Sequence, residues 1–332
     1  PGGLHGPAMI ARSFRLSIAV VSFNTRELTL RCLEATQRAA DSIDSAFTLV
    51  DNGSRDGTVK AVQLQYPLWR TLVLPENPGY GSALNRAFHE APGEFLLALN
   101  SDILMQEDAL RLLVDFLCQH PQCGLVGPAL TYPDGRAQPS ARRLPGLGFA
   151  LGDVLWLHEF FPGNVWLRRA SYADEDLASQ PWVDTVSGAA MLIRGEAFTR
   201  IGGFDEAFRM YFEETDLCRR LRGTGFRVAL HAKAHAVHAH GASTIQTAVR
   251  QVEYYLSCLR FFRKHHGLGQ ARILAAAVAL GTLARMVALL FKYPPVPRER
   301  RELLRSKLSA CGRLLRQLRS PLAESIAPEV RP

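Results

Sequence analysis

Short apolar runs alternate with amphipathic segments along the N-terminal part of the chain. The segments 15–39, 47–58, 71–91 and 93–120 each open with an apolar run that predicts a strand. Apolar residues at helical spacing then predict helices between the strands. This alternation predicts an α/β fold with a mainly parallel sheet flanked by helices.

Polar or small residues follow the apolar run in each of these segments. They are Ser22, Asn24, Asp51, Asn52, Asn77, Gly79, Asn100 and Asp102. In an open α/β sheet, the loops beyond the carboxyl ends of the strands hold the ligand. We therefore expect these residues to converge on one crevice.

The stretch FLLALNSDILM (95–105) places a carboxylate, Asp102, directly after a buried strand. This position suits a Mg²⁺ or Mn²⁺ ion that bridges a diphosphate, because such ions bind carboxylate, water and phosphate oxygens. The alternative is that Asp102 caps the helix that follows. The nearby GYGSALN has Leu84 where a dinucleotide-binding GxGxxG pattern needs glycine, and no Walker A pattern occurs. Hydride transfer and P-loop chemistry are therefore disfavoured.

Composition is that of a folded protein. The chain has 332 residues, of which 47% are hydrophobic and 21% are charged. Its six cysteines are scattered without CxxC spacing, which predicts reduced thiols in a cytoplasmic protein and no zinc site. Four histidines lie within 231–240, but no cysteine or acid accompanies them, so zinc is disfavoured there too. Residues 1–14 are expected to be a vector-derived remnant or a flexible start.

Charge is divided unevenly along the chain. Residues 246–332 hold 16 Lys and Arg against 5 acids, a net +11, whereas residues 1–245 hold 23 against 26, a net −3. No nucleic-acid motif occurs in this tail, so we expect an anionic membrane surface to be its partner. An apolar stretch at 273–291 and a basic amphipathic helix at 299–319 favour peripheral attachment or a homodimer over spanning, because spanning would bury Arg285.

The second half of the chain has an acidic centre. Glu213, Glu214 and Asp216 follow an aromatic pair and open a predicted helix. Acids in a first helical turn also interact favourably with the helix dipole, so the pattern alone leaves both interpretations open. Earlier in this half, Ser187 and Gly188 break a strand, and such small residues would let a sugar approach the backbone.

Seven motifs occur in an order that resembles a known enzyme family. They are SIAVVSFNT, LVDNGSRDGT, NPGYGSALNRA, ALNSDILM, VSGAAMLIRGEAFTRIGGFDEAF, YFEETDLCRRLRGTGFRV and VHAHGAST. Over roughly residues 15–265 the chain resembles the family 2 inverting glycosyltransferases, in particular the bacterial rhamnosyltransferase-like subgroup. The resemblance implies the GT-A fold, with a Rossmann-like sheet and a C-terminal helical extension.

The resemblance also implies a donor and metal site. Asp51 would contact the nucleotide base, although it could instead form an Asx turn into the residues that follow. Asp102 would bind Mg²⁺ or Mn²⁺, with Asn100 in place of the usual first acid, and His238 would complete the metal site or touch the diphosphate. Pro78, Gly79 and Gly81 would let the backbone pass close to the nucleotide. The expected donor site comprises Ser22, Asn24, Asp51, Asn52, Gly79, Gly81, Asn85, Asn100, Ser101 and Asp102.

The resemblance further implies which residues act on the acceptor. Glu214 takes the position of the catalytic base, which is usually an aspartate in the family, and Asp216 is the alternative. The acceptor side would include Gly188 and Glu213. Arg142 and Arg143 would grip a phosphate or form a solvated loop. For Asn85 two roles are open, namely fixing the glycine-containing loop before it or serving as a plain polar residue of the helix face.

These features predict a GT-A catalytic domain at 15–245, with a nucleotide-sugar half (15–130) and an acceptor half (131–245), followed by a basic helical region at 246–332. The expected function is metal-dependent transfer of L-rhamnose from a dTDP donor to a lipid-linked saccharide. This reaction belongs to bacterial cell-surface polysaccharide synthesis, including lipopolysaccharide, at the cytoplasmic face of the inner membrane. The alternatives are a hexosyltransferase that uses a UDP-sugar and a non-catalytic scaffold that binds a sugar nucleotide.

Overall fold

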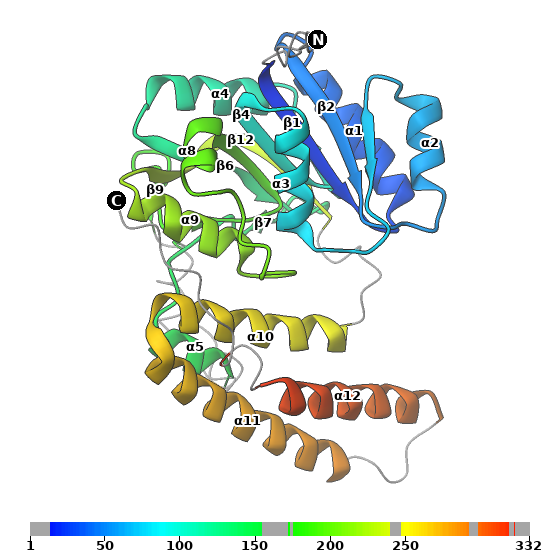
Figure 1. Ribbon diagram of the computed structural model, residues 1–332, viewed down its shortest axis with the longest axis vertical. Coiled ribbons are helices and arrows are strands. Elements are labelled where there is room, and N and C mark those ends of the chain that lie inside the picture. Colours follow the sequence, from blue (N-terminus) through cyan, green and yellow to red (C-terminus); the bar gives the residue numbers. More distant parts are fainter. Residues whose placement is uncertain are drawn as a thin grey trace, which may run out of the picture.

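The computed structural model describes residues 14–154, 172, 175–239, 247–291, 298–318 and 322, and all structural statements refer to these residues. A β-sheet with helices on its faces forms one part of the structure, and a cluster of long helices lies beside it (Figure 1). His240, which belongs to one of the quoted motifs, lies outside the described residues.

The main sheet is mixed rather than purely parallel. Its strands run in the order β3-β2-β1-β4-β11-β6-β12-β5, with β7 beside β6 and β9 beside β12. A small second sheet pairs β10 with β8. The strands are β1 (Phe14–Ser22), β2 (Ser45–Asp51), β3 (Arg70–Val73), β4 (Gly93–Asn100), β5 (Ile103–Met105), β6 (Cys123–Thr131), β7 (Ala137–Gln138), β8 (Ala141–Arg142), β9 (Trp182–Val183), β10 (Thr185–Val186), β11 (Ala190–Arg194) and β12 (Arg227–His238).

The first four strands confirm the predicted parallel arrangement. Strand β1 pairs in parallel with both β2 and β4, and β2 pairs in parallel with β3. The direction then reverses, because β11 runs antiparallel to both β4 and β6. The carboxyl ends of β1, β2 and β4 therefore meet at one edge of the sheet, as the sequence predicts.

Helices cover both faces of this sheet, as predicted. The helices of the described residues are α1 (Arg26–Ala39), α2 (Thr58–Gln65), α3 (Tyr80–Glu90), α4 (Ala109–Gln119), α5 (Leu147–Val154), α8 (Gly195–Arg200), α9 (Glu213–Gly223), α10 (Thr247–His265), α11 (Gly267–Phe291) and α12 (Arg298–Gln317); the last three and α5 lie beside the sheet. Alternate residues of β1 point to opposite faces, so that Ile18 packs with α1 and α4 whereas Ala19 packs with α3, α8 and α9.

The segment after Asp102 differs from the prediction. Residues 103–105 form β5, which pairs antiparallel with β12, and the next helix, α4, begins at Ala109 with Asp108 before it. The alternative role of Asp102 as a cap of that helix is therefore wrong. Residues 103–105 form a strand because they pair with the free edge of β12, a strand from the C-terminal end of the domain.

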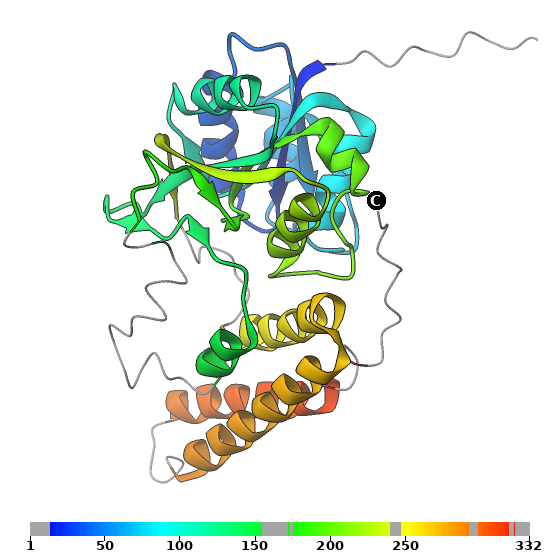
Figure 2. The ribbon, with the colours of Figure 1, turned by 90° about the vertical axis from the view of Figure 1, so that its left-hand side faces the viewer.

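The C-terminal helices form their own apolar cluster. The predicted basic helical region at 246–332 contains α10, α11 and α12, with the apolar stretch 273–291 in α11 and the amphipathic helix 299–319 in α12. These helices pack around Leu259, Phe262, Leu274 and Leu314. Helix α5, which lies within the predicted acceptor half, packs with them (Figure 2). The helical cluster therefore contains a helix from the predicted catalytic domain as well as the three helices of the C-terminal region.

Candidate active site

Asp51, at the end of β2, has one engaged and one open carboxylate oxygen. Its Oδ1 accepts backbone hydrogen bonds from Gly53 (3.1 Å) and Ser54 (2.8 Å). Its Oδ2 is buried and has no hydrogen-bond partner among the described residues. The predicted Asx turn therefore forms through Oδ1 and leaves Oδ2 without a partner. Because a buried acceptor without a partner is costly, a hydrogen-bond donor of a ligand would bind favourably to Oδ2.

Ser22 and Asn24, at the end of β1, organise the neighbouring loop. The Ser22 hydroxyl lies 2.8 Å from that of Thr29 inside the protein. Asn24 adopts a left-handed backbone conformation with φ 52°, its N–H donates to Ser54, and its side-chain oxygen accepts from the Arg55 N–H at 2.8 Å. These contacts hold the loop that follows Asp51 in place.

Asn52 ties this loop to the next one. Its side-chain amide donates to Asn77 (3.2 Å) and to the carbonyl of Gly79 (3.4 Å). The Asn52 Oδ1 is buried without a partner in the described part of the chain. Together with Asp51, it gives the edge of the sheet two unsatisfied acceptors.

Gly79 and Gly81 are required by protein packing. A Cβ on Gly79, whose φ is +104°, would lie 2.5 Å from the carbonyl oxygen of Arg209, and one on Gly81 would lie 2.8 Å from Phe204. The close approach that these glycines allow is to the segment 204–209. Their predicted approach to a nucleotide stays a prediction.

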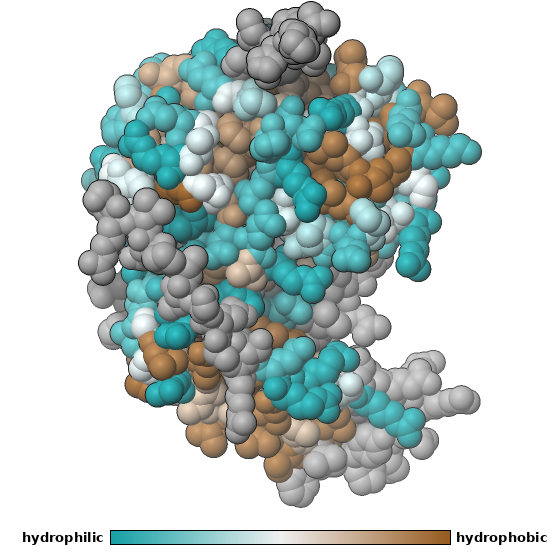
Figure 3. Space-filling view, in the orientation of Figure 1, coloured by the Kyte–Doolittle hydropathy of each residue, from teal (hydrophilic) through white to brown (hydrophobic). Residues whose placement is uncertain are grey.

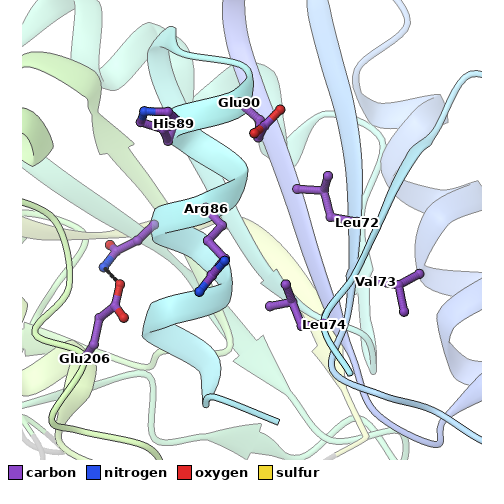
Figure 4. A pocket seen from close by; sticks show the side chains of 8 residues that line it. Leu72, Val73, Leu74, Arg86, His89, Glu90 and Glu206 are labelled. Atoms are coloured by element: carbon purple, nitrogen blue, oxygen red, sulfur yellow. Dashed lines mark hydrogen bonds between the residues drawn. The ribbon is translucent and has the colours of Figure 1, made fainter. Parts of the chain in front are cut away.

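Asn85 holds a different loop from the one predicted. Its side chain accepts from the N–H of Phe204 (2.8 Å) and donates to the Phe204 carbonyl (2.9 Å). It also donates to Glu206 at 3.0 Å (dashed line in Figure 4), and Ser82 donates to Glu206 at 2.9 Å. The prediction that Asn85 fixes the glycine loop is wrong. It anchors residues 204–206, which follow α8.

The surface hollow in Figure 4 lies on the outer side of α3. Its lining residues are Leu72, Val73, Leu74, Asn85, Arg86, His89, Glu90 and Glu206. Neither Asp51 nor Asp102 lines it, so it is separate from the strand-end site.

Asp102 and His238 meet where β5 pairs with the end of β12. The His238 Nε2 lies 3.4 Å from Asp102 Oδ1, and its Nδ1 lies 3.0 Å from the Gln138 side-chain oxygen. The hydroxyl of Ser101, by contrast, lies 2.8 Å from that of Thr25 and so points into the protein. No group of three or more His, Cys, Asp or Glu side chains able to hold a metal occurs within the described ranges. A carboxylate and an imidazole fit Mg²⁺ or Mn²⁺ when phosphate oxygens of a substrate supply further ligands.

Glu213, which is buried, and Glu214, which is half-buried, open α9, and the pKa of each carboxyl is raised. Burial, then the charge of Glu214, raises the pKa of Glu213 well above 4.5. Burial also raises the pKa of Glu214, but the Thr215 hydroxyl and the Arg142 guanidinium oppose this rise. Glu214 is therefore the member of the pair that ionises first.

Glu214 faces the strand break that the sequence predicts. A Cβ on Gly188 would lie 3.3 Å from the Glu214 side chain, so the missing side chain leaves room for the carboxylate. The Oε2 of Glu213 is buried and lacks a partner among the described residues. The Glu214 side chain therefore lies against the backbone of Gly188, and the neighbouring Glu213 has one carboxyl oxygen available for a ligand.

Tyr80 connects the two halves of the site. Its hydroxyl donates to the Gly188 carbonyl at 2.8 Å. Burial raises its pKa far above 10.0, and the charges of Glu213, Glu214 and Asp102 raise it further. The carboxylates predicted for the metal and for catalysis therefore lie around one phenol. Sequence reasoning missed Tyr80, although it lies inside the GYGSALN motif.

The two arginines of the predicted acceptor side differ in their contacts. Arg143 pairs with Glu175 and lies over the ring of Tyr172, 4.4 Å from its centre. Arg142 is exposed on β8, and its charge acts on Glu214. The structure therefore brings Arg142 to the site and engages Arg143 in the packing of a loop.

Asp216 is fully buried in an ionic cluster. Its carboxylate lies 2.6 Å from Lys264 Nζ, 2.7 Å from His265 Nε2 and 2.6 Å from Arg220 Nε. Burial alone would raise its pKa, but the His265 hydrogen bond and the charges of Arg220 and Lys264 hold that pKa well below its usual range. This carboxylate already has all its partners inside the protein.

Comparisons with known proteins agree with this geometry. Residues 17–202 match the family described as Glycosyl transferase family 2. The N-acetylglucosaminyl-diphospho-decaprenol L-rhamnosyltransferase of Mycobacterium tuberculosis is 34% identical over 228 residues, which cover 63% of this chain and 73% of that protein. Rhamnosyltransferase WbbL of Escherichia coli is 28% identical over 153 residues, which cover 46% of this chain and 54% of that protein.

A solved structure shows the same fold. The mannosyltransferase PcManGT from Pyrobaculum calidifontis, in complex with GDP-Man and Mn²⁺, superposes with a TM-score of 0.52 at 19% identity. The alignment covers 92% of this chain and 87% of that one. The sheet, its flanking helices and the C-terminal helices are thus those of a GT-A-like glycosyltransferase, and the chain belongs to glycosyl transferase family 2.

Proposed function

We propose that this enzyme transfers L-rhamnose from a dTDP donor, with inversion, to a saccharide linked to a lipid by a diphosphate. The observation that carries this proposal is the surroundings of Tyr80: its hydroxyl donates to Gly188, which lies against Glu214, and the charges of Asp102, Glu213 and Glu214 all raise its pKa. The similarity to two rhamnosyltransferases supports the sugar, and the name of the mycobacterial relative supports the acceptor class.

The nucleotide would bind at the end of β2. The free Oδ2 of Asp51 is an acceptor for a base N–H, such as the N3–H of thymine or uracil. The open Oδ1 of Asn52 supplies a second acceptor beside it. Because both loops are held by the hydrogen bonds of Asn24 and Asn77, these acceptors are fixed before the donor arrives.

The leaving diphosphate would lie at Asp102 and His238. A Mg²⁺ or Mn²⁺ ion bound there would neutralise negative charge on the leaving group. Asp102 offers a hard carboxylate oxygen. His238 would present Nε2, since its Nδ1 faces the side-chain oxygen of Gln138 and is best protonated.

Glu214 is the proposed base. As the acceptor hydroxyl attacks the anomeric carbon, its proton passes to the Glu214 carboxylate, and the carbon–oxygen bond to the diphosphate breaks on the opposite face. The raised pKa of Glu214 makes it a stronger base than an exposed carboxylate. Burial and the charge of Glu214 favour the protonated form of Glu213, which can donate a hydrogen bond to the incoming saccharide. Arg142, exposed near the base, is placed to hold an acceptor phosphate.

Peripheral attachment to the cytoplasmic face of the inner membrane is part of this proposal. Helix α11 contains the one stretch in the described ranges, Gly267–Leu289, that is long and apolar enough to cross a membrane. One side of this helix packs on α10 and α12, and the other exposes Ile273, Leu280, Leu283 and Val287. Figure 3 shows apolar surface along this edge of the molecule.

The packing of α11 supports lying at the interface over spanning. Its residues Leu274 and Val278 are buried against the other helices, and Arg285 is turned toward the Tyr255 hydroxyl at 3.4 Å. If α11 crossed the bilayer, these contacts with α10 and α12 would be lost. An exposed apolar stripe beside the basic helix α12 instead suits an anionic lipid surface, where each basic residue contributes about 1 kcal/mol.

A donor and acceptor panel tests the proposal. The full chain is incubated with dTDP-L-rhamnose, a set of UDP-hexoses or GDP-mannose, together with Mg²⁺ or Mn²⁺ and a short-chain GlcNAc-diphospho-polyprenol. Mass spectrometry detects the product, and NMR gives its anomeric configuration. Preferred use of a UDP-sugar would replace the proposed donor, and nucleotide binding without transfer or hydrolysis would indicate the scaffold alternative.

A further inference from the structure

The turn that leads into the catalytic helix is strained. Tyr211 and Phe212, directly before Glu213, both have φ of 65°, in the left-handed region that non-glycine residues rarely occupy. This backbone conformation is unfavourable for them because it brings Cβ too close to the following carbonyl oxygen. The direction in which α9 begins depends on this turn, so other contacts must hold it.

Helix α10 of the C-terminal extension supplies those contacts. The Ser257 hydroxyl donates to the carbonyl of Met210 at 2.8 Å, which fixes the start of the turn. The Tyr254 ring lies 5.5 Å from that of Phe212, and the Phe261 ring lies at the same distance on another side. The strained turn is thus bound by one face of α10.

The last turn of α10 also binds α9 itself. Lys264 and His265 both contact the buried carboxylate of Asp216, which lies one helical turn after Glu213. Lys264 contacts Asp205 as well, at 2.7 Å. The first turn of α9 is therefore held by α10 from both ends, at the turn before it and at the carboxylate after it.

We propose that α10 is a positioning element of the active site: Ser257, acting on the strained turn, and Lys264, acting on Asp216, set the place of the Glu213–Glu214 carboxyls. This inference rests on the proposed function and deepens it. It also assigns Asp216 a positioning role, since its carboxylate has its partners within the protein.

The opposite side of α9 explains why such positioning matters. Glu214 lies against Gly188, with 3.3 Å between its Cβ and the place of a missing Cβ. The carboxylate thus has little freedom between the sheet and the turn held by α10. A displacement of about 1 Å at a reacting group can cost about 100-fold in rate. Helix α10 begins well after residue 202, where the match to the family ends, so this device belongs to the extension.

Single substitutions in the full chain test the inference. Ser257→Ala removes one hydrogen bond, and Lys264→Met removes one cation while keeping the length of the side chain. Ser42→Ala and Lys60→Met are matched controls, because both residues are exposed and lie outside the site and the C-terminal helices. Lys264→Arg, which can still pair with Asp216, is the rescue variant.

We expect kcat for sugar transfer to fall by about 10- to 100-fold in Ser257→Ala and Lys264→Met. The KM for the donor and the dissociation constant of the free nucleoside diphosphate should stay within about twofold of the wild type, because Asp51 and Asp102 lie on other elements. Lys264→Arg should recover much of the rate, and both control variants should match the wild type.

Two results would overturn the inference. One is a kcat within about twofold of the wild type in both α10 variants. The other is a parallel loss of kcat, nucleotide affinity and the thermal transition, which would make α10 a folding element alone. Absence of transfer by the wild type from every donor would instead refute the proposed function, so the two failures are distinguishable.

Discussion

Replacing Glu214 by glutamine tests the proposed base directly. The amide keeps the size of the side chain and can still accept the hydrogen bond that Thr215 donates at 2.9 Å. What is lost is the proton acceptor. General base catalysis contributes about 10²- to 10⁴-fold, so kcat should fall by that factor, which corresponds to about 2.7–5.5 kcal/mol of transition-state stabilisation.

The pH dependence adds a second readout for the wild type. Transfer requires the ionised form of Glu214, and burial raises the pKa of this group above 4.5. The rate should therefore rise with pH along a limb that lies above the pKa of an ordinary glutamate. Initial rates measured across this range at saturating donor give the limb for kcat, and in Glu214→Gln it should disappear.

Two neighbouring substitutions are controls for this experiment. Glu213→Gln resembles the protonated form that burial and the charge of Glu214 favour, so the acid limb should remain in place. Glu214→Asp restores the residue that the family usually has, but it withdraws the carboxylate by roughly 1.5 Å, and we expect a loss of about 10- to 100-fold. A near-wild-type rate in Glu214→Gln, or a larger loss in Asp216→Asn with unchanged nucleotide affinity and stability, would refute the assignment of the base.

Three further predictions concern the donor, the metal and the membrane. Asp51→Ala should weaken nucleotide binding by about 10- to 100-fold in calorimetry, since it removes a charged acceptor worth about 1.5–3 kcal/mol; equal affinity would contradict the base contact. Asp102→Ala should abolish turnover and the effect of Mn²⁺ on nucleotide affinity, and retained turnover would exclude a metal role. The double variant Leu280→Glu/Leu283→Glu should float less with anionic vesicles, and high salt should reduce flotation of the wild type. The control Leu64→Glu, on the exposed side of α2, should float normally. Undiminished flotation of the double variant would exclude membrane binding by the exposed apolar side of α11.

The parallel part of the fold could be predicted because each strand is marked locally. Phe95 to Leu99, for example, are all fully buried, and this apolar run is bounded by polar residues. The strand at 103–105 could not be predicted in this way. It exists because β12, more than 120 residues later, pairs with it, and no local pattern reports such a partner.

The same distinction separates the site residues. Asp51 and Asp102 were accessible from sequence, since a carboxylate directly after a buried strand lies at the ligand edge of an α/β sheet. Gly81 and Asn85 lie in an equally suggestive motif, yet their contacts are with Phe204 and its neighbours. A small or amide residue looks the same in sequence whether a ligand or a distant loop occupies the space beside it.

The three acids of α9 show how the environment divides roles that sequence cannot. Glu213, Glu214 and Asp216 lie within one helical turn, so the helix dipole acts on all of them in the same sense and cannot separate them. Desolvation outweighs the other interactions of Glu213 and Glu214 and raises the pKa of both, whereas Asp216, in contact with Lys264, has a depressed pKa. A carboxylate with a depressed pKa is a poor base, and Glu214, which lies against Gly188, is the acid that we propose as the base. The elements packed against α9 therefore give the three acids different roles. The contacts of α10 make Asp216 a residue that holds the helix in place, and the site beside Gly188 leaves Glu214 suited to remove a proton.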